Sequence, residues 1–178
     1  MEYMEKVNDH VIEHRRTIHS YAELGGMEYK TRDYILQQIK QWDLPYEMIT
    51  ETALIATLDT GREGPHIALR ADMDALPMRE HPENLKGPKI CVSEQENTCH
   101  ACGHDAHVAM LLGSMEVFCK KVEELSGVLY FCFEAGEENG VSAIQMVEAL
   151  SKRRVDTVWA IHVYAALDSG VLGIRSGA

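Results

Sequence analysis

The segment GPHIALRADMDALPM, residues 64–78, joins a short apolar run to a cluster of charged residues. The run His66–Leu69 predicts a β-strand, and Arg70, Asp72 and Asp74 follow it directly. Polar side chains just beyond the end of a strand are common ligand-binding positions in open α/β sheets. The segment therefore predicts one strand of a central sheet and one side of a functional site.

Helix-like and strand-like patterns alternate on both sides of this segment. Apolar residues recur at helical spacing in 5–21, 28–42, 105–121 and 141–150. Short apolar runs predict strands at Ala53–Leu58, Val128–Phe133, Thr157–Val163 and Val171–Ile174. The polar stretch between Asp72 and Thr98 predicts a long loop, and loops of this length are often functional. The alternation favours an α/β sandwich with a largely parallel sheet.

The composition is that of an acidic globular protein. The chain has 178 residues and is 46% hydrophobic, which is enough for one domain with a core. Its 17 Lys and Arg stand against 28 Asp and Glu, a formal charge of −11. This balance argues against nucleic acid or an anionic membrane as a partner, because both require a basic face.

The sequence also bears on the location of the protein and on its cysteines. The N-terminus, MEYMEKVNDH, has no basic start followed by an apolar run, so we expect no secretory signal. No apolar stretch approaches the length of about 18 residues that a membrane span requires. We therefore expect a cytoplasmic protein whose five cysteines are free thiols.

The most specific motif is HACGHDAH, residues 100–107, at the start of a predicted helix. Cys102 and His104 offer a thiolate and an imidazole, which are usual ligands of zinc and related divalent ions. One alternative is a helix cap at Asp105 with incidental histidines. Cys99 and Cys102 also have C-x-x-C spacing, but a zinc ribbon requires a second pair and a thioredoxin-like site requires a preceding early strand. The sequence has neither feature.

The segment FEAGEENG, residues 133–140, places Glu137 and Glu138 directly after a predicted strand. Adjacent carboxylates point in different directions, so one can bind a metal while the other faces a water molecule. A metal lowers the pKa of bound water, and a nearby carboxylate can then accept its proton. The alternative is an acidic turn that caps the helix beginning near Val141.

His162 and the two aspartates are weaker candidates when taken singly. His162 ends a third predicted strand, where a lone histidine is usually a polar residue bonded to its neighbours. Asp72 or Asp74 could bind metal or hold a ligating histidine by its other ring nitrogen. The alternatives are a capped turn before Pro77 and a plain ion pair between Arg70 and Asp72. Because all three clusters follow strand ends, we expect them to form one site.

Together, these segments resemble the aminoacylase-like metallo-amidohydrolases, a zinc-peptidase-like family. It includes hippurate hydrolase, N-acetyl-diaminopimelate deacetylase, the bacterial aminoacylases and the plant auxin-conjugate hydrolases. The resemblance rests on HRRTIHSYAELGGMEYKT, GPHIALRADMDALPM, CHACGHDAHVAMLLG, FEAGEE and AIHV. It implies a three-layer α/β sandwich around a largely parallel or mixed sheet, of which this chain is the front half.

The resemblance also implies an activity and roles for single residues. The activity is metal-dependent hydrolysis of the amide bond of N-acyl amino acids or related small amides. Two divalent ions are expected, zinc or manganese, with cobalt or nickel as alternatives. Glu137 is expected to be the general base and Asp74 a carboxylate behind the ligands. The implied metal ligands are Cys102, His104, Glu138 and His162. FEAGEE differs from the FQPAEE common in this branch but keeps both glutamates.

Members of the family continue beyond the point where this chain stops. The resemblance implies that 1–178 is the N-terminal part of the catalytic metal-binding domain, without the inserted dimerisation domain and the C-terminal catalytic segment. We therefore expect this chain to lack one metal ligand and the oxyanion donor of the insert, and to have little activity alone. The family is often dimeric. Two alternatives stay open: a non-catalytic metal-binding or interaction module, and one piece of a split enzyme completed by another chain.

Overall fold

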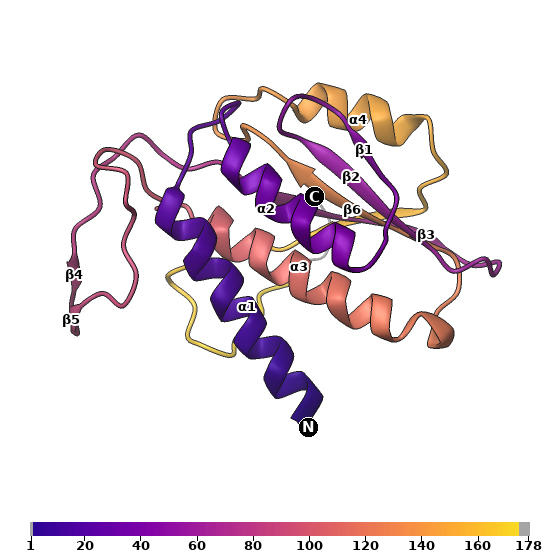
Figure 1. The fold of residues 1–178 in the computed structure, drawn as a ribbon, viewed down its shortest axis with the longest axis horizontal. Coiled ribbons are helices and arrows are strands. Elements are labelled where there is room, and N and C mark those ends of the chain that lie inside the picture. The colour runs from indigo at the N-terminus through magenta and orange to yellow at the C-terminus, as the bar shows by residue number, and fades with distance from the viewer. Residues whose placement is uncertain (1, 175–178) are drawn as a thin grey trace.

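The computed structural model describes residues 2–174 (Figure 1). Its helices are α1 (Glu2–Tyr21), α2 (Tyr29–Gln41), α3 (His104–Lys120), the 3-10 helix η1 (Val122–Glu124) and α4 (Ala143–Ser151). Its strands are β1 (Tyr46–Met48), β2 (Leu54–Asp59), β3 (His66–Asp72), β4 (Glu83–Asn84), β5 (Gly87–Pro88), β6 (Val128–Glu134) and β7 (Thr157–Ala160). The four predicted α-helices are all present, with boundaries shifted by a few residues.

Five strands form one mixed sheet in the order β1-β2-β6-β3-β7. β6 and β7 both pair with β3 in parallel, whereas β2 pairs antiparallel with β1 and with β6. The parallel pairs arise where a helix separates two strands along the chain, as α3 does between β3 and β6. β1 and β2 are joined by a short turn, which permits only antiparallel pairing. The sheet is therefore mixed, as the broader form of the prediction allowed.

Helices cover both faces of the sheet. α1 and α3 lie together below it in the view of Figure 1, and α4 lies above it. The central strand β6 is buried along almost its whole length, and Phe131 and Phe133 are fully buried. Leu112 from α3 and Met146 from α4 belong to the same core. A central strand buried on both faces explains why its sequence is nearly continuously apolar rather than alternating.

The last strand departs from the prediction. A strand was expected over Thr157–Val163, but β7 ends at Ala160, and Val171–Ile174 has no regular structure. β7 pairs only with β3, and no other strand among residues 2–174 lies on its outer edge. The apolar side chains of Val158 and Trp159 are 59% and 62% exposed. The apolar pattern thus predicted the strand correctly but overestimated its length, since the pairing with β3 stops at Arg70 and Ala160.

The long polar loop after β3 is confirmed, and its only strands are the two-residue pair β4 and β5. All five cysteines are free, as expected. Within residues 2–174, no helix combines the length and the apolar character needed to cross a membrane.

Phe131→Ala should lower the free energy of unfolding by about 3–5 kcal/mol, because it leaves a cavity at the centre of the sheet. Urea denaturation measures the change. Leu85→Ala is the control, since Leu85 is fully exposed and its truncation should cost less than about 0.5 kcal/mol. Equal losses in the two variants would contradict the placement of Phe131 in the core.

Candidate metal centre

The candidate residues gather at one edge of the sheet. β3, β6 and β7 run parallel, so their carboxyl ends lie side by side. The residues that follow them are Asp74 after β3, Glu137 and Glu138 after β6, and His162 after β7. His104, the first residue of α3, lies against the same edge. The expectation that three strand-end clusters converge is met.

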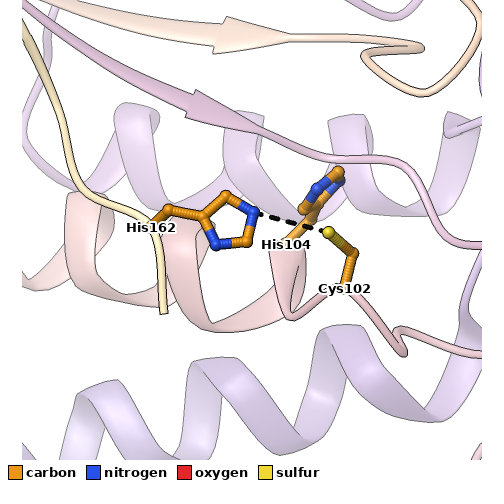
Figure 2. Close-up of side chains that lie close together, drawn as sticks. All are labelled: Cys102, His104 and His162. Atoms are coloured by element: carbon orange, nitrogen blue, oxygen red, sulfur yellow. Dashed lines mark hydrogen bonds between the residues drawn. The ribbon is translucent and has the colours of Figure 1, made fainter. Parts of the chain in front are cut away.

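Cys102 and His162 form one pair within this group. Cys102 Sγ lies 3.4 Å from His162 Nε2. His162 Nδ1 lies 2.7 Å from the carbonyl oxygen of Val163, so a proton on Nδ1 leaves the Nε2 lone pair facing the thiol. Figure 2 shows the ring of His104 beside this pair, edge-on to the His162 ring with centroids 6.0 Å apart. Three side chains from two segments distant in sequence thus meet at one point.

His104 is the centre of the cluster. Its side chain is fully buried, and its Nδ1 lies 3.1 Å from Asp74 Oδ1. Its Nε2 is buried and has no hydrogen-bond partner among the described residues. That atom faces carboxylate oxygens of Asp72, Glu138 and Glu137 at 3.7, 3.9 and 4.0 Å. These distances are too long for hydrogen bonds. An orphaned ring nitrogen facing three carboxylates is the arrangement expected around a cation.

The donor atoms satisfy a simple geometric test for metal binding. His104 belongs to three groups whose candidate ligand atoms lie within 4.8 Å of one another: Cys102, His104 and His162; Asp72, His104 and His107; and His104, Glu137 and Glu138. Thiol, imidazole and carboxylate together are the ligand types of zinc and related divalent ions. The residues present therefore fit a divalent metal.

Asp74 connects the imidazole to the glutamate-bearing turn. Its carboxylate accepts hydrogen bonds from the backbone N–H groups of Glu137 and Glu138 at 3.1 and 3.0 Å, in addition to the bond from His104. Burial alone would raise the pKa of Asp74, but the bonds from His104 and the two amides outweigh it and lower this pKa overall. Asp74 is therefore an anion that orients groups on two different elements.

Burial, hydrogen bonds and neighbouring carboxylates shift the pKa values of His104 and Cys102. Burial would lower the pKa of His104, but the bond to Asp74 and the nearby charges of Asp72 and Asp74 raise it overall. Burial, followed by the hydrogen bond and charge of Glu138, raises the pKa of Cys102 to about 11. A metal ion would reverse both effects, because it favours the thiolate and the neutral imidazole.

His107 has a place in the site that the sequence reasoning missed. It is buried, its Nδ1 lies 2.6 Å from Asp72 Oδ1, and its Nε2 accepts the backbone N–H of Val163 at 2.9 Å. It thereby fixes the segment that carries His162. The available signal was its spacing of three residues from His104, which puts both rings on one helix face.

Of two simpler interpretations, the Arg70–Asp72 ion pair is present and the helix cap at Asp105 is not. Arg70 does pair with Asp72, at 2.7 Å, so that ion pair exists beside the cluster. Asp105 does not cap α3, whose N-cap position is Gly103. Its carboxylate instead bonds to His19 at 2.7 Å, on the α1 side of the helix.

The acidic turn does not cap α4. The N-cap residue of that helix is Ser142, and the two glutamates of the turn face His104. Their side chains are 42% and 33% exposed, for Glu137 and Glu138 respectively. They are therefore open to a small molecule arriving from solvent.

The chain is similar to several known proteins over nearly its whole length. The chain is 35% identical over 176 residues to thermostable carboxypeptidase 1 of Saccharolobus solfataricus and to the N-acyl-L-amino acid amidohydrolase of Geobacillus stearothermophilus. It is 37% identical over 164 residues to the IAA-amino acid hydrolase ILR1-like 5 of Arabidopsis thaliana. These matches cover 97%, 98% and 92% of this chain but only 44%, 46% and 36% of the relatives.

A solved structure is also similar to this chain over nearly its whole length. The crystal structure of the Bacillus subtilis YxeP protein, described as a dinuclear metal-binding peptidase of family M20, superposes with a TM-score of 0.87 at 30% identity. The match covers 97% of this chain and 48% of that one. The chain thus spans less than half the length of the relatives it matches.

The resemblance drawn from the sequence motifs is confirmed by these relatives, which include amidohydrolases of the expected kind. A family model matches residues 68–177, which is more than half of the chain and includes every residue of the candidate centre. The chain belongs to peptidase family M20/M25/M40.

Proposed function

We propose that this chain is the metal-binding part of a hydrolase that cleaves the amide bond of N-acyl amino acids or related small amides. The observation that carries the proposal is the buried, unpartnered Nε2 of His104 facing carboxylates and a thiol–imidazole pair. The amidohydrolases among the relatives support the amide as the bond that is cleaved. The acidic composition favours a small-molecule substrate over nucleic acid.

In this proposal, the ligands of the metal are Cys102, His104, Glu138 and His162. Two ions agree with the dinuclear character of the structural neighbour, and zinc or manganese suits the ligand set, with cobalt or nickel as alternatives. A divalent ion held here supplies Lewis acidity toward the amide carbonyl and the attacking water.

Glu137 is the general base of the proposed mechanism. It takes a proton from the attacking water and delivers it to the leaving nitrogen. Asp74 keeps Glu137 and Glu138 in separate roles, as base and as metal ligand. It accepts hydrogen bonds from the backbone amides of both glutamates and so fixes their relative directions.

Residues 1–178 are then the N-terminal part of a catalytic domain. The exposed apolar edge of β7, with Val158 and Trp159, is the surface against which further chain would pack. Such an addition would supply the remaining ligand and oxyanion contacts. Loss of one oxyanion donor can cost about 10²–10³ in rate, so this chain alone should turn over slowly.

The purified chain should bind zinc or manganese and hydrolyse N-acetyl or N-benzoyl amino acids weakly. Metal content after dialysis and amino acid release by a ninhydrin assay measure the two properties. Binding without turnover supports a preformed centre that needs further contacts. A folded chain that takes up neither metal at saturating concentration would contradict the proposal.

Cys102→Ala should weaken metal binding by at least about tenfold, because it removes a ligand from a centre with few others. Competition with a chromogenic chelator gives the dissociation constant. Cys119→Ala is the matched control, since Cys119 lies in the last turn of α3 and should leave the dissociation constant unchanged. Equal affinities of the two variants would remove Cys102 from the ligand set.

Glu137→Gln should keep the metal content, whereas Glu138→Gln should lower it, because the first change removes a base and the second a ligand. Where the unaltered chain shows turnover, Glu137→Gln should reduce it by about 10²–10⁴. Metal analysis and hydrolysis rate are measured on the same preparations. Similar metal loss in both variants would refute the assignment of separate roles.

A further inference from the structure

The turn that carries Glu137 and Glu138 is held by side chains from outside it. Four successive backbone N–H groups, from Ala135 to Glu138, each donate to a side-chain oxygen. Ser142 accepts the first bond at 3.0 Å and Asp74 accepts the last two. The second, from Gly136, goes to Glu28 Oε1 at 2.7 Å. No site role was expected for Glu28.

Glu28 comes from a part of the chain far from the turn. It occupies the N-cap position of α2, is separated from Gly136 by 108 residues, and is fully buried. Burial raises the pKa of Glu28, and its second carboxyl oxygen, Oε2, has no hydrogen-bond partner among the described residues. Burial of a carboxyl group destabilises the fold unless its oxygens accept hydrogen bonds. One of the two oxygens accepts the bond from the Gly136 N–H.

The neighbouring glycines show that the contact is close. A Cβ on Gly25 would lie 2.9 Å from Gly136 Cα and 2.6 Å from Asn139 Nδ2. The Asn139 side-chain amide donates to the carbonyl oxygen of Gly25 at 3.1 Å. The segment before α2 and the turn after β6 therefore touch backbone to backbone, and Glu28 fastens this contact.

Gly136 is the point where the turn most needs support. Its φ is +62°, and glycine has more backbone freedom than any other residue. It directly precedes Glu137, so a rotation at Gly136 redirects both glutamates. A buried N–H without an acceptor is destabilising, so loss of the bond to Glu28 would favour a rearranged turn.

We propose that Glu28 is a positioning residue for the Glu137–Glu138 pair. By accepting the Gly136 N–H, it fixes the turn from the α2 side, while Asp74 fixes it from the β3 side. Both carboxyls are needed to keep the two glutamates directed at His104. The inference rests on the proposed metal-binding role of Glu138.

The test compares three variants of the whole chain by Co²⁺ titration. Glu28→Met has nearly the same shape and no acceptor, and should weaken Co²⁺ binding about tenfold or more, the effect typical of outer residues that orient ligands. Glu28→Gln keeps an acceptor oxygen and should stay within about threefold of the unaltered chain. Glu116→Met is the matched control, because Glu116 is also buried and bonded, to His10 and Lys120 on α1 and α3.

The Co²⁺ spectrum separates positioning from general loosening. The thiolate-to-cobalt absorption of Cys102 should persist in Glu28→Met, while the ligand-field bands change because Glu138 is displaced. Thermal unfolding of all variants measures any loss of stability. Unchanged Co²⁺ affinity in Glu28→Met, or an equal loss in Glu116→Met, would overturn the inference.

Amide hydrogen exchange of Gly136, Glu137 and Glu138 in the metal-free chain gives a second readout. Exchange should accelerate in Glu28→Met but not in Glu116→Met, and equal protection in both would overturn the inference. If the unaltered chain binds neither Co²⁺ nor zinc or manganese, the proposed function fails and the exchange result alone decides the role of Glu28. Glu28→Asp, shorter by one methylene, replaces Glu28→Met with the same expectations if the latter does not fold.

Discussion

The arrangement of the centre depends on one buried carboxylate, that of Asp74. An anion removed from water must be surrounded by donors, and here the donors are the ring of His104 and the amides of Glu137 and Glu138. These groups belong to α3 and to the turn after β6. The hydrogen bonds to this one carboxylate therefore fix the positions of the two elements relative to each other. Asp74 lies two residues beyond the end of β3, the strand between β6 and β7, and so reaches the turn after β6.

A second set of buried polar contacts surrounds the first and also links different elements. Asp72 bonds to His107, and His107 bonds to the backbone of Val163 beside His162. Glu28 similarly accepts a hydrogen bond from the backbone of the turn after β6. Asp72, the glutamate-bearing turn and the segment of His162 are thus each held by a buried polar group on another element. Orientation at the centre is therefore a property of the packed fold rather than of any single loop.

Much of the architecture could be predicted from local patterns. The apolar runs and helical periodicities gave the main strands and all four α-helices, because each is long enough for its burial to show in the sequence. β1 was missed because its three residues are all exposed and leave no pattern. The length of β7 was overestimated because the point where pairing with β3 stops depends on tertiary contacts, which local sequence does not contain. The candidate residues could be proposed because metal-binding residue types cluster in short motifs, and the structure brings them together. Glu28 and His107 were missed because their significance lies in contacts between distant segments.

The exposed edge of β7 has a thermodynamic consequence. His162 follows this strand by two residues, so whatever orders the strand also orders a residue of the candidate metal centre. If another segment or chain pairs with β7, its association and the binding of metal become linked equilibria, and each must strengthen the other by the same factor. Metal binding would then stabilise the association of the added segment with β7, and removal of the metal would weaken that association.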